Sequence, residues 1–246
     1  MPIMTQGMKP CRLRCLAALY RLLASPLEAT RLPTLSGPQQ PPKSGGAPDS
    51  LVIMLHGIGS NGDDLMGLAP YFADALPNTA VHAPNAPEPY ADAGFGYQWY
   101  PRHAMPHDGN AERVEQTVNA YIDELLQEYG LDVSRCVLLG FSQGSIVSLH
   151  VAPRRSTAVA GVVAFSGSMP TAATLGQEKA SAPPMLLIHG TEDRVLEPGE
   201  SESAAKKLSE LGVPVTLHIL PGLGHSIDQR GIAIAIEFMK QVLNVT

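Results

Sequence analysis

A serine bracketed by glycines is the first group in this chain whose type and setting could carry out covalent chemistry. It lies in Gly140-Phe141-Ser142-Gln143-Gly144, after a short apolar stretch and before a stretch with helical character. A serine in a tight strand-to-helix turn needs small neighbours two positions away, and such a turn presents the hydroxyl above the sheet. The pattern predicts that Ser142 is a nucleophile. A glycine-bracketed turn with a capping serine is the structural alternative.

A serine hydroxyl is a weak nucleophile near neutral pH, so it needs a base, and the base needs an orienting carboxylate. After a turn of this kind, the acid and then the histidine follow the serine along the chain. His225 lies in the glycine-rich stretch 221–226 after a predicted strand, whereas His218 lies inside that strand. Asp193 follows an earlier predicted strand. We therefore expect Asp193 to orient His225, and His225 to accept the proton of Ser142.

Hydrolysis of an ester also needs two donors for the negative charge that develops on the carbonyl oxygen. The backbone N–H of Gln143, directly after the nucleophile, is the first candidate. The second is the N–H of Ile58, in the loop His56-Gly57-Ile58-Gly59 that follows the first inner strand. A plain glycine turn is the alternative for this loop.

Apolar side chains near the predicted strand ends are candidates for the wall of an acyl groove. They are Met66, Leu68, Trp99 and Met169. Methionine would supply adaptable packing there, and ordinary core packing is the alternative. No long segment is inserted between the predicted strands at 159–165 and 185–189, so we expect no bulky lid. A site without a lid favours short-to-medium acyl esters or thioesters over long triglycerides.

The elements that must position these residues follow from the alternation of short apolar runs and helical patterns. Strands are predicted at 51–55, 79–83, 136–139, 159–165, 185–189 and 213–220. Helices are predicted at 63–76, 111–129, 143–151, 199–211 and 227–243, and the segment 84–109 is expected to be irregular. This alternation predicts an α/β fold with a mainly parallel sheet and helices on both faces. Ligands bind at the carboxyl ends of the strands in such sheets.

The length of 246 residues and an apolar fraction of 44% fit one domain with a sizeable core. Residues 33–50 are rich in Pro, Gly, Ser and Gln, which is typical of a linker or a surface turn region. We place the domain at 28–246 because an edge strand is expected at 29–35. Residues 1–27 are then an N-terminal basic leader, expected to be flexible.

Charge and cysteine content exclude several classes of protein. The net charge of −6 divides into +4 for residues 1–24 and −10 for the rest, which does not suit nucleic-acid binding. The basic leader permits at most weak contact with an anionic membrane surface. Cys11, Cys15 and Cys136 form neither a disulfide framework nor a metal site. No apolar stretch approaches about 18 residues, and we expect a cytoplasmic protein. The oligomeric state is not indicated.

The motifs resemble those of the phospholipase/carboxylesterase family of α/β-hydrolases, which includes the acyl-protein thioesterases. The resemblance covers about residues 50–245, in family order. The matching pieces are Leu55-His56-Gly57-Ile58-Gly59, Asp63-Asp64-Leu65, Ala83-Pro84-Asn85-Ala86-Pro87, Gln98-Trp99-Tyr100, Gly140-Phe141-Ser142-Gln143-Gly144, Phe165-Ser166-Gly167, His189-Gly190-Thr191-Glu192-Asp193-Arg194-Val195 and Gly224-His225.

The resemblance implies an α/β-hydrolase fold without a large cap domain, acting on small-molecule carboxylic esters or thioesters. No cofactor or metal is implied. Two departures bear on the acyl-chain preference: Leu196-Glu197-Pro198 replaces a Val-Pro that many relatives have, and Tyr100 replaces a frequent Phe. A peptidase or lactone hydrolase of the same fold, and a non-catalytic ligand-binding protein, are the alternative functions.

Overall fold

The structure, a computed structural model, describes residues 34–245 apart from residues 93, 103 and 106. The predicted leader, its two cysteines Cys11 and Cys15, and the domain start expected at residue 28 lie outside the described residues.

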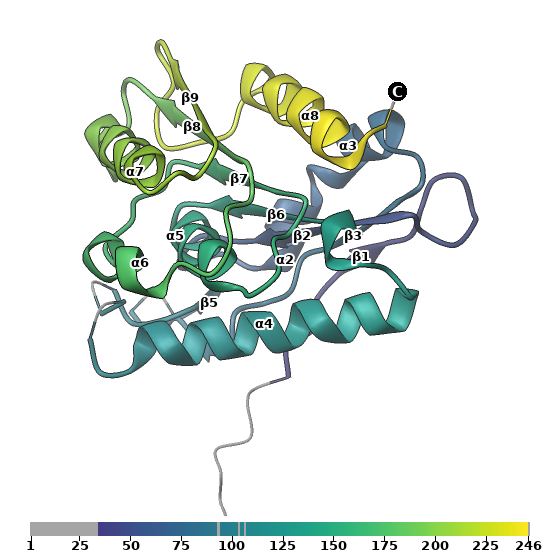
Figure 1. Cartoon of the computed structure of the whole chain (residues 1–246), viewed down its shortest axis with the longest axis horizontal. Coiled ribbons are helices and arrows are strands. Elements are labelled where there is room, and N and C mark those ends of the chain that lie inside the picture. The colour runs from purple at the N-terminus through teal and green to yellow at the C-terminus, as the bar shows by residue number, and fades with distance from the viewer. Residues whose placement is uncertain (1–33, 93, 103, 106, 246) are drawn as a thin grey trace, which may run out of the picture. The chain divides into compact units, whose positions relative to one another are not determined.

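A seven-stranded sheet forms the centre of the described part, in the order β1-β3-β2-β6-β7-β8-β9 (Figure 1). Every neighbouring pair is parallel except β1 and β3. The predicted mainly parallel sheet is therefore confirmed. The strands are β1 (Gln39–Gln40), β2 (Ser50–Leu55), β3 (Thr79–His82), β6 (Cys136–Phe141), β7 (Gly161–Phe165), β8 (Met185–Gly190) and β9 (Val215–Leu220).

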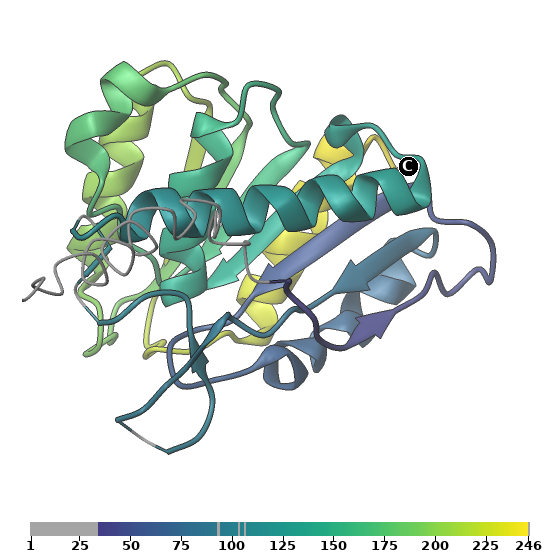
Figure 2. The same ribbon diagram turned by 90° about the horizontal axis from the view of Figure 1, so that it is seen from below.

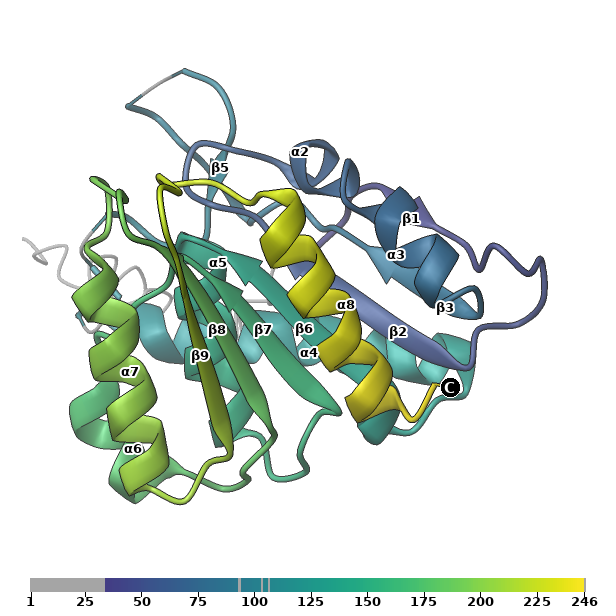
Figure 3. The same ribbon diagram turned by 90° about the horizontal axis from the view of Figure 1, so that it is seen from above.

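Helices cover both faces of the sheet, as predicted. Successive residues of β2 point to opposite faces, so Ile53 packs into one apolar cluster and Met54 into the other. One cluster holds side chains from α4 (Asn110–Tyr129), α5 (Gln143–Val151), α6 (Ala172–Glu178) and α7 (Pro198–Glu210). The other holds side chains from α2 (Gly62–Met66), α3 (Ala69–Ala75) and α8 (Gln229–Leu243). Figure 2 shows α4 lying across one face, and Figure 3 shows α8 lying across the other.

The single helix expected at 63–76 is wrong, because the structure divides this stretch into α2 and α3. Pro70 lies in the first turn of α3. Proline lacks the N–H that a continuous helix would need there and is tolerated in a first turn. Asn61 caps α2 by accepting the N–H of Asp64 at 3.0 Å, and the first helix begins at Gly62, one residue before the predicted start at residue 63.

The edge of the sheet also differs from the prediction. The edge strand expected at 29–35 is not present at residues 34 and 35, the two of its positions that the structure describes. The edge is β1 instead, inside the stretch predicted to be a linker, and it pairs antiparallel with β3. Prolines flank it on both sides, which an edge strand tolerates because only one of its sides is hydrogen-bonded.

The segment after β3 contains a small hairpin that the sequence did not indicate. β4 (Glu88–Pro89) pairs antiparallel with β5 (Tyr97–Gln98). Between β7 and β8, α6 is the only regular element among the described residues, so this connection holds no bulky lid. None of the helices in the described ranges is long and apolar enough to cross a membrane.

Candidate active site

The turn around Ser142 joins β6 to α5 with a strained backbone. Ser142 has φ 54° and ψ −116°, in a region where L-residues are uncommon. A Cβ on Gly140 would lie 2.4 Å from the backbone of Gly144, and a Cβ on Gly144 would lie 1.8 Å from the carbonyl oxygen of Leu55. Both glycines are therefore needed for β2, β6 and α5 to approach closely. The N–H of Ser142 donates to Phe165 in β7 at 2.9 Å.

Loops after three different strands bring Ser142, His225 and Asp193 together. Nε2 of His225 lies 2.9 Å from Oγ of Ser142, and Nδ1 of His225 lies 2.7 Å from Oδ2 of Asp193. A carboxylate only accepts hydrogen bonds, so Nδ1 carries the proton and Nε2 is free to accept the serine hydroxyl. The side chain of Asp193 is fully buried, whereas that of His225 is 17% exposed. This arrangement can transfer a proton from Ser142 to His225.

The carboxyl group of Asp193 stays ionised despite its burial. Burial by itself would raise the pKa of Asp193, but hydrogen bonds from His225 and from the backbone N–H groups of Leu196 and Val195 outweigh it. The net pKa therefore lies below its ordinary value. The two N–H groups donate to Oδ1 at 2.9 Å from Val195 and 3.0 Å from Leu196. Oδ2 is thereby left for the imidazole.

The loops that carry Asp193 and His225 are held to one another. The N–H of Glu192 donates to the carbonyl of Leu223 at 2.9 Å, and the N–H of Gly222 donates to Oγ1 of Thr191 at 2.9 Å. A Cβ on Gly190 would lie 2.1 Å from the carbonyl oxygen of Leu223, so glycine is required for this approach. These contacts hold the acid and the base at a defined separation.

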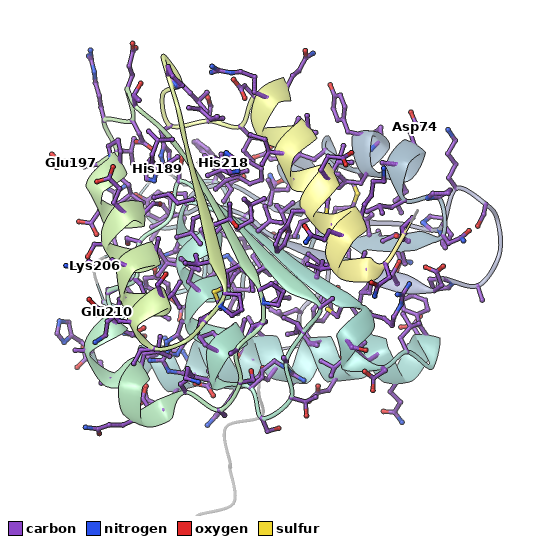
Figure 4. The ribbon with its side chains drawn as sticks, turned by 45° about the horizontal axis from the view of Figure 1, so that its top comes forward. Asp74, His189, Glu197, Lys206, Glu210 and His218 are labelled. Carbon is purple, nitrogen blue, oxygen red and sulfur yellow. The ribbon has the colours of Figure 1, made fainter. Side chains whose placement is uncertain are left out.

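The other histidines after Ser142 lie elsewhere. His218 is half-buried in β9 (Figure 4). It borders a hollow that α8 also lines. Nδ1 of His150 bonds with Oγ1 of Thr171 at 3.0 Å. His189 is fully buried at the end of β8 and contacts Asp193 rather than Ser142.

The loop proposed to supply an oxyanion donor lies against the nucleophile. A Cβ on Gly57 would lie 3.3 Å from Cβ of Ser142. Across the described ranges, neither the N–H of Ile58 nor the N–H of Gln143 has a hydrogen-bond partner. Two unused donors beside a candidate nucleophile can accept the charge of a tetrahedral intermediate.

His56, which the sequence reasoning did not assign a role, organises this loop. Its Nδ1 donates to the carbonyl of Gly57 at 2.7 Å, and its Nε2 accepts the N–H of Ala86 at 2.9 Å. Its carbonyl accepts the indole N–H of Trp99 at 2.9 Å. Burial lowers the pKa of His56, although the bond to Gly57 and the charge of Asp64 partly oppose that shift. The imidazole is therefore neutral, with a defined tautomer.

The side chain of Gln143 is a second feature that the sequence did not reveal. Its Oε1 accepts the N–H of Trp99 at 2.9 Å, and its Nε2 donates to the carbonyl of Tyr100 at 2.8 Å. The glutamine thus ties the segment after β5 to the first turn of α5. The motif Gln98-Trp99-Tyr100 was visible in the sequence, but its partner 43 residues away was not.

The acyl groove expected from the sequence is not assembled. Met66 and Leu68 pack on the α8 side of the sheet, whereas Trp99 and Met169 are buried on the α4 side. Trp99 is 1% exposed, and both of its N–H groups are used inside the protein. A different cavity of about 120 Å³ opens beside Ser142, lined by Ile58, Tyr100, Arg102, Gln143, Ile146, Val195 and Leu196. Two of its residues, Tyr100 and Leu196, are the noted departures from the family pattern.

Two larger hollows of about 530 and 670 Å³ lie around His150 and around His218. Neither is lined by Ser142, His225 or Asp193. The chemistry therefore identifies the small cavity as the candidate active site, although the other two are larger.

Comparisons with known proteins show which family the chain belongs to. Residues 42–243 match the family described as Phospholipase/Carboxylesterase. Esterase YpfH of Escherichia coli strain K12 is 28% identical over 78% of this chain and 83% of its own length. Acyl-protein thioesterase 1 of Debaryomyces hansenii is 28% identical over 79% of this chain and 91% of its own length. Lysophospholipase-like protein 1 of Mus musculus is 27% identical over 75% and 83%.

Solved structures are similar in fold. Esterase PE8 is 39% identical, with a TM-score of 0.80 over 85% of this chain and 100% of its own. SOBER1 of Arabidopsis thaliana is 25% identical, with a TM-score of 0.70 over 79% and 99%. The expected α/β-hydrolase fold without a large cap is confirmed. The chain belongs to the phospholipase/carboxylesterase family and is a hydrolase of the carboxylesterase and thioesterase type.

Proposed function

We propose that this hydrolase cleaves carboxylic esters or thioesters with short-to-medium acyl chains through an acyl-enzyme formed on Ser142. One observation carries the proposal: two consecutive hydrogen bonds link Ser142 Oγ to His225 Nε2 at 2.9 Å and His225 Nδ1 to Asp193 Oδ2 at 2.7 Å. A hydroxyl, a base and a buried carboxylate in this order form the arrangement that activates serine.

In the proposed reaction, Ser142 Oγ attacks the carbonyl carbon while Nε2 of His225 takes its proton. Asp193 holds the ring and stabilises the imidazolium. The N–H groups of Ile58 and Gln143 stabilise the negative oxygen. When the intermediate collapses, the leaving alcohol or thiol takes the proton from His225. Water then repeats the attack with His225 as the base, which frees the acid and restores Ser142.

The cavity supports the preference for shorter acyl chains. Its volume of about 120 Å³ lies well below the roughly 300–1,000 Å³ of sites that hold drug-sized ligands. Ile58, Ile146 and Leu196 give it an apolar wall. Each methylene that becomes buried contributes about 0.8 kcal/mol, which is roughly fourfold in kcat/KM, until the cavity is filled.

The nucleophile and the base are tested by three single variants. Ser142→Ala and His225→Ala should each lower kcat by several orders of magnitude, because members of a triad act as a unit. His218→Ala is the matched control and should change kcat little, since His218 lies in β9 away from Ser142. Kinetics with p-nitrophenyl butyrate, together with circular dichroism, provide the measurement. A folded Ser142→Ala protein that keeps more than about a tenth of the wild-type rate would exclude Ser142 as the nucleophile.

The substrate class is tested with graded acyl chains. Activity on p-nitrophenyl esters should rise from acetate over the next few members and then level off or fall, and an acyl thioester should also be cleaved. Mass spectrometry after rapid quenching should find the acyl group on Ser142. Faster hydrolysis of emulsified triolein than of dissolved butyrate would contradict the substrate class, and preferred cleavage of lactones or peptides would support the alternative enzymes.

We further propose that the catalytic domain spans 28–246 and that residues 1–27 form a separate basic leader. The family match begins at residue 42, which supports a catalytic body that does not need the leader. Deletion of residues 1–27 should leave ester hydrolysis nearly unchanged. Weak contact of the leader with an anionic membrane and a cytoplasmic location stay predictions from the sequence.

A further inference from the structure

His189 is a fully buried imidazole that touches the proposed acid of the triad. It lies near the end of β8, close to the first turn of α7, and its side chain is 0% exposed (Figure 4). Its Nε2 lies 3.1 Å from Oδ2 of Asp193. The same oxygen faces Nδ1 of His225 at 2.7 Å. Among the described titratable side chains, His189 and His225 are the two in ion-pair distance of Asp193.

Further contacts fix the orientation of the His189 ring. Nε2 lies 2.9 Å from the carbonyl oxygen of Leu196, and because a carbonyl only accepts, Nε2 must carry a proton. Nδ1 bonds with Oγ of Ser201 in α7 at 2.7 Å, and this Oγ lies 3.0 Å from the carbonyl oxygen of Gly167. The ring is therefore held from both sides, with its Nε2–H directed into the acid loop.

The acid and one wall of the substrate cavity share this support. Asp193 binds the N–H of Leu196, and His189 binds the carbonyl of the same residue. Leu196 and its neighbour Val195 line the cavity beside Ser142. A change at His189 would therefore reach both the carboxylate that orients His225 and the wall that the acyl chain contacts.

We propose that His189 is a positioning residue for the hydrolytic reaction, acting through Asp193 and Leu196. Its Nε2–H holds the acid loop in place and puts a second positive dipole beside Oδ2 of Asp193. This dipole and the bond to the carbonyl of Leu196 keep Oδ2 of Asp193 directed at Nδ1 of His225. The inference rests on the proposed function of Ser142, His225 and Asp193.

The test compares two replacements of His189. In His189→Gln the side-chain amide can place a donor where Nε2 was, whereas in His189→Asn the shorter side chain reaches only the position of Nδ1. His189→Asn should lower kcat/KM by about 10- to 100-fold because the acid is misplaced. The fall should lie mainly in kcat rather than in KM, because a misplaced acid impairs the chemical step. His189→Gln should recover most of the wild-type kcat.

A buried histidine outside this contact network provides the control. His82 in β3 is 4% exposed, and β2, β6 and β7 separate its strand from β8. His82→Asn should lower the melting temperature while kcat stays near the wild-type value. The proposal is overturned if folded His189→Asn keeps the wild-type kcat, or if the Gln and Asn variants are equally impaired.

If neither variant folds, His189 is a core residue only, and the proposal also fails. These results are distinct from failure of the proposed function. That failure would appear as retained activity in Ser142→Ala or His225→Ala, whatever the His189 variants do.

Discussion

The turn around Ser142 and the β4–β5 hairpin both lie next to the oxyanion loop, yet they are built in opposite ways. The turn is closed by backbone approaches so tight that Gly140 and Gly144 have no room for a Cβ. At the tip of the hairpin, Phe95 is 72% exposed, and a Cβ on Gly94 would meet nothing within 4 Å. The hairpin is closely packed at Gly96, where a Cβ would lie 2.1 Å from the carbonyl oxygen of Gly59, and at Trp99, which is 1% exposed.

The difference separates the proposed nucleophile from a hairpin that supports the loop beside it. A nucleophile must keep its geometry to a fraction of an ångström, and closely packed strands give that accuracy. The base of the hairpin contributes by bonding to His56 and Gln143, which hold the two proposed oxyanion donors. The tip makes no such contact in the described part of the chain. Variants in each region test this contrast.

The largest effect is expected at the packed turn, from Gly144→Ala. The new Cβ would lie 1.8 Å from the carbonyl oxygen of Leu55, so β2 and α5 must separate. We expect a loss of roughly 3 kcal/mol or more in the free energy of unfolding, measured with urea, and loss of esterase activity.

The matched control for that variant is Gly199→Ala, in α7. This glycine also lies in a helix, and a Cβ there would meet nothing within 4 Å. Its stability should be unchanged or raised by about 0.4–1 kcal/mol. If Gly144→Ala and Gly199→Ala are equally stable, the turn around Ser142 is not closely packed and the contrast with the hairpin is wrong.

An intermediate effect is expected at His56, which joins the two regions. Its folded-state pKa lies below the ordinary value of 6.5 mainly because of burial, so the unfolded chain binds the proton more readily. The contribution of His56 to stability is then complete above about pH 6.5 and is lost as the pH falls through the lower folded-state pKa. Wild type should lose stability from pH 7.5 to pH 5.

The His56→Gln variant isolates that contribution. The variant should be less stable than wild type at pH 7.5. The difference in free energy of unfolding between the two proteins should become smaller at pH 5, as measured by urea unfolding at both pH values. His82, whose pKa burial lowers to about 4, is present in both proteins, so its effect cancels. If this difference in free energy of unfolding stays constant or becomes larger at pH 5, His56 is not the titrating group.

The smallest effect is expected at the hairpin tip, from Phe95→Ser. Because the ring is mostly exposed, the free energy of unfolding should change by less than about 0.5 kcal/mol. The kcat for p-nitrophenyl butyrate should stay at the wild-type level. A fall of more than tenfold in kcat/KM would place the tip in contact with substrate and would remove the distinction between the two regions.

Local patterns were sufficient for the parallel strands and for nominating Ser142, Asp193 and His225. Short apolar runs mark buried strands, and the glycine spacing around Ser142 has a steric cause within five residues. Long-range packing was not accessible in the same way. Whether Met66 and Met169 share a face depends on where helices break and which side of the sheet each loop takes. The partner of His56 Nε2 is 30 residues away, and no local pattern specifies it.

The position of β9 in the sequence determines when the proposed triad can be completed during synthesis. β9 is the last strand of the sheet, and the loop after it carries His225, 83 residues beyond Ser142. At ~5–20 residues per second, the ribosome needs roughly 4 to 17 seconds to pass from one to the other. During that interval the nascent chain carries the proposed nucleophile without its proposed base. From the proposed mechanism we therefore expect ester hydrolysis to begin only after the sheet has received its final strand.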